Sequence, residues 1–211
     1  MKYQAVIFDL FGTLVDSFTI KAHEDSVREI AEALAVSADD LNYIWHGIFS
    51  FGALDSYQTT EENMRHICRE LGVAADEEKI KLASQLRSDF IMQTLKPRRE
   101  AVDVISRLRK EGLKIGLISD SSVEVPLSWG ETPFAPLFDV TVFSCAVGLQ
   151  KPDARIYQLA MEMLEVKPEA CLYVGDGGSQ ETKRAKESLY LGTFAGPSGT
   201  RGRDTAPTGE R

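Results

Sequence analysis

The stretch FDLFGTLVDS, residues 8–17, completes an apolar run that begins at Ala5 and places an acid, Asp9, directly after it. This pattern is typical of a buried strand that carries a carboxylate into a loop. If Asp9 attacks a substrate, a second acid two residues later would be the natural proton donor. Phe11 occupies that position instead. The stretch therefore predicts a strand that delivers a carboxylate to a loop, and it raises the question of which chemistry an aspartate performs without that partner.

Short apolar runs of the same kind recur along the chain, bounded by polar or glycine residues and rich in β-branched and aromatic side chains. They cover residues 3–8, 113–119, 140–145, 171–176 and 190–196, and we expect each to be a buried strand. Helical segments are predicted over residues 97–112, 152–166 and 179–188. This alternation predicts an α/β fold, in which helices cover both faces of a parallel sheet.

Residues 17–95 interrupt the alternation with four helical patterns. Their apolar side chains form four groups, which run from Ile20 to Leu34, from Leu41 to Ile48, from Met64 to Leu71 and from Ile80 to Phe90. Ser37 and Thr60 are the expected N-caps of the second and third helices. We therefore expect an α/β core over 1–16 and 96–196, an inserted helical domain over 17–95, and a loose tail over 197–211.

The composition limits the possible partners. Of the 211 residues, 43% are apolar and 27% are charged, which is typical of a soluble globular protein. The net charge of −8, without a stripe of Lys and Arg, argues against nucleic acid. No apolar run approaches the roughly 20 residues of a membrane span, and we expect no signal peptide. Cys68, Cys145 and Cys171 are expected to be reduced thiols of a cytoplasmic protein.

Polar side chains follow the predicted strands. Asp9 ends the first strand, Ser119 and Asp120 end the second, Lys151 follows the third, and Asp176 ends the fourth. In an open parallel sheet, ligands bind beyond the carboxyl ends of the strands. Each of these residues alone would be ordinary turn chemistry. Together they place three acids, a hydroxyl and an ammonium on one rim, which predicts an active site at that edge of the sheet.

Four segments resemble, in order, the motifs of the haloacid dehalogenase-like (HAD) hydrolase superfamily: DLFGTL (9–14), ISDSS (118–122), GLQKPD (148–153) and YVGDGGSQE (173–181). The resemblance extends from residue 3 to about residue 196. It implies a Rossmann-like parallel-sheet core. Residues 17–95 resemble the helical C1 cap of this superfamily, which closes over the site. The resemblance also implies a small-molecule substrate, and it says nothing of the oligomeric state.

The resemblance implies a role for each polar residue on the rim. Asp9 would be the nucleophile, forming a covalent aspartyl intermediate that water then cleaves. Ser119 would hydrogen-bond the transferring group, and Lys151 would hold Asp9 as a carboxylate and offset charge developing on the substrate. The substrate-binding residues would be Gly12, Thr13 and Asp120.

A magnesium ion is also implied. Its ligands would be the side chains of Asp9, Asp176 and Glu181 and the backbone carbonyl of Phe11, an oxygen set that suits this hard cation. The charge balance agrees with this, because three carboxylates crowded against the single Lys151 leave net negative charge near a buried rim.

Phe11 leaves three interpretations open. The phosphatases of the superfamily usually carry Asp at this position, and losing general acid–base help typically costs about 10²–10⁴-fold in rate. We favour a magnesium-dependent hydrolase of a small phosphorylated metabolite. An aromatic here resembles the 2-haloacid dehalogenases, which use no metal and bind the substrate carboxylate with an early cap arginine; the early candidate, Arg28, is expected to face solvent. The third interpretation is a binding or regulatory protein without turnover.

Two further stretches each allow two readings. Trp45, His46, Phe49 and Phe51 either form a lid surface over an apolar substrate or belong to the core of the helical domain, which we favour on burial habits. Residues 121–129 either place Glu124 and Trp129 beside the site or form a helix that packs on the core.

Overall fold

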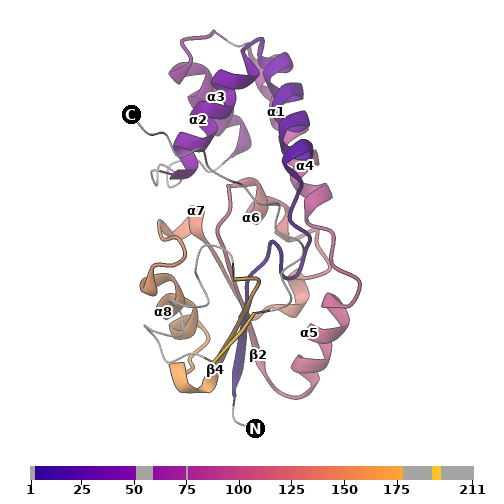
Figure 1. Ribbon diagram of the computed structural model, residues 1–211, viewed down its shortest axis with the longest axis vertical. Helices are drawn as coiled ribbons and strands as arrows, with labels where there is room; N and C mark the ends of the chain where they lie inside the picture. The colour runs from indigo at the N-terminus through magenta and orange to yellow at the C-terminus, as the bar shows by residue number, and fades with distance from the viewer. Residues whose placement is uncertain (1–2, 51–58, 75, 178–191, 196–211) are drawn as a thin grey trace, which may run out of the picture.

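The computed structural model describes residues 3–50, 59–74, 76–177 and 192–195. Figure 1 shows a lower unit built on a β-sheet and an upper group of helices. The chain leaves the lower unit after its first strand, passes through the four helices and returns to complete the sheet. The α/β fold predicted from the sequence is confirmed.

In the part of the chain that the structure describes, five parallel strands form the sheet, in the order β3-β2-β1-β4-β5. They are β1 (Ala5–Phe8), β2 (Lys114–Ser119), β3 (Val140–Phe143), β4 (Cys171–Gly175) and β5 (Gly192–Ala195). The first strand is central, with Phe8 beside Leu117 of β2 and Val174 of β4. The segments that follow these three strands therefore meet at one edge of the sheet.

Both faces of β1 are buried. Ala5 and Ile7 pack in a cluster with residues of α8 (Ala154–Met163). Val6 and Phe8 pack in a second cluster with Ile105 of α5 (Ala101–Lys110). Successive residues of a strand point to opposite faces, so a strand covered on both sides must be apolar throughout. This explains the uninterrupted apolar run before Asp9.

Several element ends differ from the predicted ones. α5 begins at Ala101, and α8 begins at Ala154, because the carboxylate of Asp153 caps it by accepting the backbone N–H of Arg155. The third strand ends at Phe143, because residues Ser144–Val147 form the short helix α7. Two short 3₁₀ segments, Ala135–Leu137 and Pro168–Ala170, precede β3 and β4. The predicted helix 179–188 and the tail 197–211 lie outside the described residues.

The upper group, here called the helical unit (residues 20–94), contains the four predicted helices: α1 (Ile20–Leu34), α2 (Ala38–Ser50), α3 (Thr60–Glu70) and α4 (Glu77–Thr94). They share a hydrophobic cluster of their own. The hydroxyl of Ser37 accepts the backbone N–H of Asp40, as predicted for a cap. The prediction for α3 was wrong by one residue. Thr59 is the N-cap, accepting the N–H of Glu62, because Thr60 is already helical and buried.

The two connections between the units run side by side. Val15, on the way out, pairs with Pro97, on the way back, and the N–H of Arg98 donates to the carbonyl of Leu14 at 2.9 Å. Arg98 also forms an ion pair with Asp16 at 2.8 Å. Two adjacent chain segments therefore connect the helical unit to the sheet, and the contacts between them hold the start and the end of the helical unit together.

Cys68, Cys145 and Cys171 are free thiols, as expected. Burial raises the pKa of Cys171 to about 12, so this thiol stays protonated near neutral pH. Within the described residues, no helix combines the length and the apolar character needed to span a bilayer.

Gly116 of β2 lies where α8 approaches the sheet most closely. A Cβ added at this position would be 2.9 Å from Cδ1 of Leu164, the C-cap of α8, and 3.1 Å from Cγ1 of Ile7. Both neighbours are buried in the same cluster and cannot move into solvent. The absence of a side chain at Gly116 therefore sets the separation between α8 and the sheet.

We predict that Gly116→Ala destabilises the protein by about 1–3 kcal/mol, because the added methyl overpacks this contact. Gly130→Ala is the matched control, since a Cβ at Gly130 meets nothing within 4 Å. That change should stay within about 0.5 kcal/mol of the wild type. Urea unfolding measures both free energies. Equal stability of the two variants would show that the α8 contact is not tight.

Candidate active site

Asp9 continues the edge of the central strand. Its backbone N–H donates to the carbonyl of Val174 at 2.9 Å, which extends the pairing of β1 with β4 by one residue. The side chain is held at the rim, and the residue as a whole is only 4% exposed. A carboxylate this buried needs a compensating charge or hydrogen bonds. Both are present.

Lys151 and Thr13 engage the two oxygens of the Asp9 carboxylate. The ammonium of Lys151 forms an ion pair with Oδ1, and both side chains are 6% exposed. The hydroxyl of Thr13 donates to Oδ2 at 3.0 Å. Residues from two distant segments of the chain therefore meet, and Asp9 and Lys151 form a buried cation–anion pair at the end of β1.

Asp120 positions the segment that carries Lys151. Its Oδ1 accepts the backbone N–H of Lys151 at 3.0 Å. Burial raises the pKa of the Asp120 carboxyl above its usual value, the positive charge of Lys151 opposes this, and the negative charge of Asp9 adds to it. Asp120 lies within the predicted site, where it contacts the backbone of a neighbouring motif.

Ser119 ends β2 with a side chain that is fully buried. Its hydroxyl finds no hydrogen-bond partner among the described residues, and neither does the hydroxyl of Ser121. Buried hydroxyls are rarely left unpaired. Two such groups in one segment of the rim are free to hydrogen-bond a ligand.

Gly12 allows Asp176 to approach the loop that follows Asp9. Gly12 has φ +80°, which favours glycine, and a Cβ added there would lie 2.9 Å from Cγ of Asp176 and closer still to its Oδ2. A side chain at position 12 would therefore occupy the place of the Asp176 carboxylate. The Gly-Thr pair serves the site through Thr13, which binds Asp9, and through Gly12, which leaves room for a second acid.

The predicted magnesium ligands are tested only in part. Asp9 and Asp176 follow neighbouring strands, and the backbone of Phe11 belongs to the loop against which Asp176 packs. Glu181 lies outside the described residues. Within the described ranges, no three His, Cys, Asp or Glu side chains come together as a metal cluster. The described donors are the carboxylates of Asp9 and Asp176 and the backbone carbonyl of Phe11. All are oxygens, which suits a hard divalent cation.

Phe11 packs toward the chain that leads into the helical unit. Its ring lies 6.1 Å from that of Phe18, nearly at right angles. Phe18 in turn contacts Phe90 of α4, at 5.7 Å between ring centroids, and stacks on His23 of α1. The side chain that replaces an acid at this position therefore takes part in aromatic packing between the catalytic loop and the helical unit.

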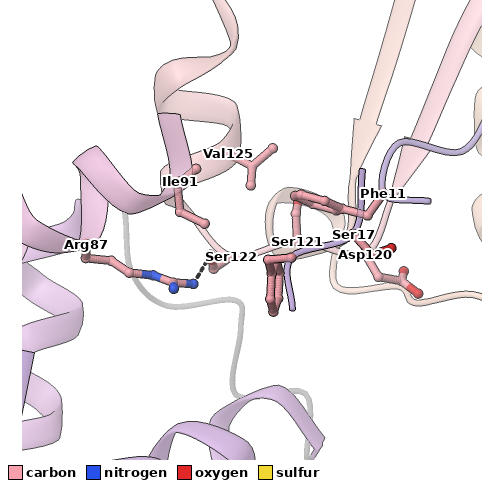
Figure 2. Close-up of a pocket in the computed structure, with 9 residues that line it drawn as sticks. Phe11, Ser17, Arg87, Ile91, Asp120, Ser121, Ser122 and Val125 are labelled. Carbon is pink, nitrogen blue, oxygen red and sulfur yellow. Dashed lines mark hydrogen bonds between the residues drawn. The ribbon is translucent and has the colours of Figure 1, made fainter. Parts of the chain in front are cut away.

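A pocket of about 270 Å³ lies between the helical unit and the sheet edge. Its lining comes from the loop after β1, from α4 and from the segment after β2: Phe11, Ser17, Phe18, Arg87, Ile91, Asp120, Ser121, Ser122 and Val125. Figure 2 shows Arg87 on one side of the pocket and Phe11 and Asp120 on the other. The pocket therefore lies between Phe11 and Asp120 on one side and the guanidinium of Arg87 on the other.

Sequence reasoning missed Arg87, although a signal was present. Ala83, Arg87 and Ile91 follow one another at intervals of four on the buried side of α4, where a charged residue is out of place. Arg87 is 5% exposed. The expected position of Arg28 is correct, since its side chain is 60% exposed and pairs with Asp25.

The two open readings of the sequence are now settled for the described residues. Trp45 is buried in the core of the helical unit and Trp129 in the core beneath the sheet edge. Glu124, at the start of α6 (Glu124–Trp129), is fully buried and faces Arg87, with Oε2 3.7 Å from Nε of the arginine. Of the remaining lid candidates, Phe51 and the side chains of His46 and Phe49 lie outside the described part.

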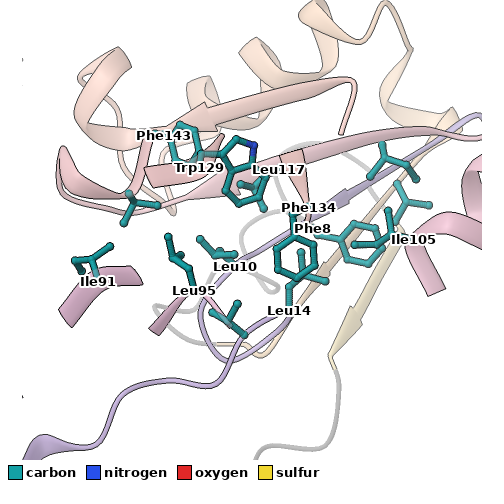
Figure 3. Packing of buried hydrophobic residues seen from close by; sticks show 14 residues of the cluster. Phe8, Leu10, Leu14, Ile91, Leu95, Ile105, Leu117, Trp129, Phe134 and Phe143 are labelled. Carbon is teal, nitrogen blue, oxygen red and sulfur yellow. The ribbon is translucent and has the colours of Figure 1, made fainter. Parts of the chain in front are cut away.

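α4 belongs to both hydrophobic cores. Ile80 and Ala83, in its first half, pack in the cluster of the helical unit. Ile91 and Leu95, at its end, pack with residues of the sheet unit such as Leu10 (Figure 3). Arg87 lies between these two contacts. The wall of the pocket that carries Arg87 is therefore attached at both ends.

Comparison with known proteins agrees with this architecture. The chain is 28% identical over 182 residues to an (S)-2-haloacid dehalogenase of Pseudomonas putida, covering 81% of this chain and 75% of that protein. It is also 28% identical over 186 residues to a phosphatase of Mycobacterium tuberculosis, covering 83% and 80% of the two chains.

A magnesium complex of a HAD family enzyme from Bacteroides thetaiotaomicron has the same fold, with a TM-score of 0.70, 16% identity and 98% of each chain covered. The family model described as haloacid dehalogenase-like hydrolase matches residues 3–182. On this match and on the geometry above, the chain belongs to the haloacid dehalogenase-like hydrolase family.

Proposed function

We propose that this protein is a magnesium-dependent hydrolase that releases phosphate from a small phosphorylated metabolite through a covalent intermediate on Asp9. The observation that carries the proposal is the placement of a second carboxylate, Asp176, against Gly12 in the loop that follows Asp9. Asp9 and Asp176 follow neighbouring strands, and together with the carbonyl of Phe11 they supply the oxygen ligands that magnesium prefers.

The side chains around Asp9 suit nucleophilic catalysis. An oxygen of Asp9 bonds to phosphorus while the bond from phosphorus to the ester oxygen breaks, and the departing alcohol takes a proton from solvent. Water then attacks phosphorus, the bond to Asp9 breaks, and inorganic phosphate leaves. Lys151 offsets the charge that develops on the phosphoryl oxygens, and Ser119 donates its hydrogen bond to the same group.

Magnesium would be held by the side chains of Asp9, Asp176 and Glu181 and by the carbonyl of Phe11. When bound, it would draw negative charge from the phosphoryl group and orient it for attack. The helical unit would serve as the cap of this site, and the assignment of residues 17–95 to that role is part of the proposal. Its support is the pocket at the boundary between the two units.

A second candidate is a halide-displacing hydrolase that acts on a short haloacid. Phe11 favours it, because a halide leaves with its electron pair and needs no proton donor. An oxygen of Asp9 would bond to carbon as the halide departs, and water would then cleave the resulting ester. The relatives include both (S)-2-haloacid dehalogenases and a phosphatase at the same 28% identity. A protein that binds but does not turn over remains the third alternative.

The experiment that separates these candidates is a panel of phosphate esters and 2-haloacids, each assayed with and without magnesium. Phosphate release that requires magnesium supports the proposal. Halide release without metal would replace it with the second candidate. Binding without release of either product would leave the third.

We predict that Asp9→Asn lowers kcat by about 10⁴-fold or more, since the variant keeps the shape of the side chain and removes the attacking charge. The matched control is Asp103→Asn, at an exposed position on α5. It should retain full activity. Circular dichroism checks that both variants fold. Turnover near the wild-type level in Asp9→Asn would rule out this nucleophile.

We predict that magnesium raises the melting temperature, because a ligand that binds only the folded state stabilises it. At about 100 times the dissociation constant the gain is about 2.7 kcal/mol, or about 5–10 °C for a chain of this size. Asp176→Ala should abolish the shift, and Asp103→Ala should keep it. If millimolar magnesium leaves the wild type unshifted, the metal-free candidate gains support.

We predict that Phe11→Asp raises the rate with alkyl phosphates, because it supplies a proton donor two residues beyond the nucleophile. The gain should be small for p-nitrophenyl phosphate, whose leaving group needs little protonation. The change also removes the contact with Phe18 and can destabilise the protein, so unfolding is measured alongside the rate. A stable variant that shows no rise with any alkyl phosphate would count against the phosphatase.

A further inference from the structure

Arg87 is a buried cation with unused hydrogen-bonding capacity. A guanidinium carries five N–H donors. Its Nη2 donates a hydrogen bond to the hydroxyl of Ser122 at a long 3.3 Å, and the buried Nε has no hydrogen-bond acceptor among the described residues. A buried arginine normally fills these positions with carboxylate or carbonyl oxygens. This one is left incompletely satisfied, and it lines a pocket.

Glu124 balances the charge of Arg87 without completing its hydrogen bonds. Its Oε2 lies 3.7 Å from Nε, too far for a hydrogen bond, and neither of its oxygens has a hydrogen-bond partner among the described residues. Burial lowers the pKa of Arg87, and the Coulombic attraction of Glu124 offsets part of this lowering. Glu124 therefore keeps a cation in the wall of the pocket while leaving room for a second acceptor.

Aromatic rings fix the plane of the guanidinium. Its central carbon lies 4.5 Å from the ring centroid of Trp45 and 5.6 Å from that of Phe90. Stacking of this kind covers the face of the guanidinium and leaves its N–H edge for acceptors in the plane. Ser122 lies beside that edge, and the pocket lining also includes the unpaired hydroxyl of Ser121.

The rest of the pocket limits what can reach Arg87. Ile91 and Val125 contribute apolar side chains to its lining, and Phe11 and Asp120 lie on the side opposite Arg87 (Figure 2). A volume of about 270 Å³ lies just below the range of about 300–1,000 Å³ that is typical of small-molecule pockets. The pocket therefore suits a small molecule with a short apolar body and an anionic group at the end remote from Phe11 and Asp120.

The geometry points to Arg87 as the specificity residue of this site: it binds a carboxylate at the far end of a small substrate whose reacting group lies at Asp9. The inference rests on the proposed function for that reacting group. A carboxylate fits better than a second phosphate, because its two oxygens match the planar edge of a guanidinium and its single charge adds least to that of Glu124.

The substrates for the test are 2-carboxyethyl phosphate and propyl phosphate, which differ in a carboxylate against a methyl group. Removing Arg87 alone would leave Glu124 buried without a partner and could prevent folding. The main variant is therefore Arg87→Met/Glu124→Gln, which removes both charges. Glu124→Gln alone keeps the cation and removes its competitor. Arg65→Met, on the exposed surface of α3, is the control for losing an arginine.

For 2-carboxyethyl phosphate, the double variant should raise KM about tenfold to a hundredfold, as expected for the loss of a charged hydrogen-bonded pair, with little change in kcat. For propyl phosphate its KM should stay near that of the wild type. Glu124→Gln should lower KM for the carboxylated ester, and Arg65→Met should change neither substrate. A folded double variant that keeps the wild-type preference between the two esters overturns the inference and makes Arg87 a purely structural residue.

A binding measurement keeps this test independent of turnover. Butanoate, which carries the carboxylate and no reacting group, is titrated calorimetrically into the wild type, the double variant and Arg65→Met. Binding that is lost only in the double variant supports the inference even if neither ester is hydrolysed, in which case the proposed phosphatase activity fails by itself. The absence of butanoate binding to the wild type, together with equal KM effects on both esters, overturns it.

Discussion

The site depends on the buried ion pair between Asp9 and Lys151. Both side chains are almost inaccessible to water, so each charge would be strongly unfavourable without the other. The pair cannot form by local folding, because 142 positions separate the two residues. It requires the central strand to deliver Asp9, the segment after β3 to deliver Lys151, and Asp120 to hold the backbone of Lys151. The parallel sheet brings these segments to one edge.

Much of the fold could be read from the sequence, because burial on both faces makes parallel strands apolar without interruption. All five predicted strands and the four helices of the helical unit are present. The ends of elements were less predictable. The choice between Thr59 and Thr60 as a cap depends on which hydroxyl faces the free N–H groups, and adjacent threonines carry no sequence signal for that. Likewise, α7 replaces the end of a predicted strand through a turn of only four residues.

The polar part of the site was predictable for a different reason. Asp9, Thr13 and Lys151 belong to motifs that follow strands of the sheet, and the topology of the sheet brings them together. Arg87 comes from a helix 78 positions beyond Asp9, and its contact with Ser122 depends on how α4 rests against α6. Motif spacing contains no information on that packing. Burial of a charged side chain in an apolar stripe was the available clue, and it identifies an unusual residue without saying what it faces.

Because α4 packs in both hydrophobic cores, the wall of the pocket that it forms is held at both ends. Ile91 is embedded in the core of the sheet unit, and Arg87 stands four residues earlier on the same continuous helix. At 1.5 Å per residue, the guanidinium-bearing position is about 6 Å along the helix axis from that anchor. The spacing is set by main-chain hydrogen bonds, which are stiffer than a loop. The wall of the pocket between Ile91 and Arg87 therefore resists deformation, and a rigid wall discriminates between ligands of different size more sharply than a loop would.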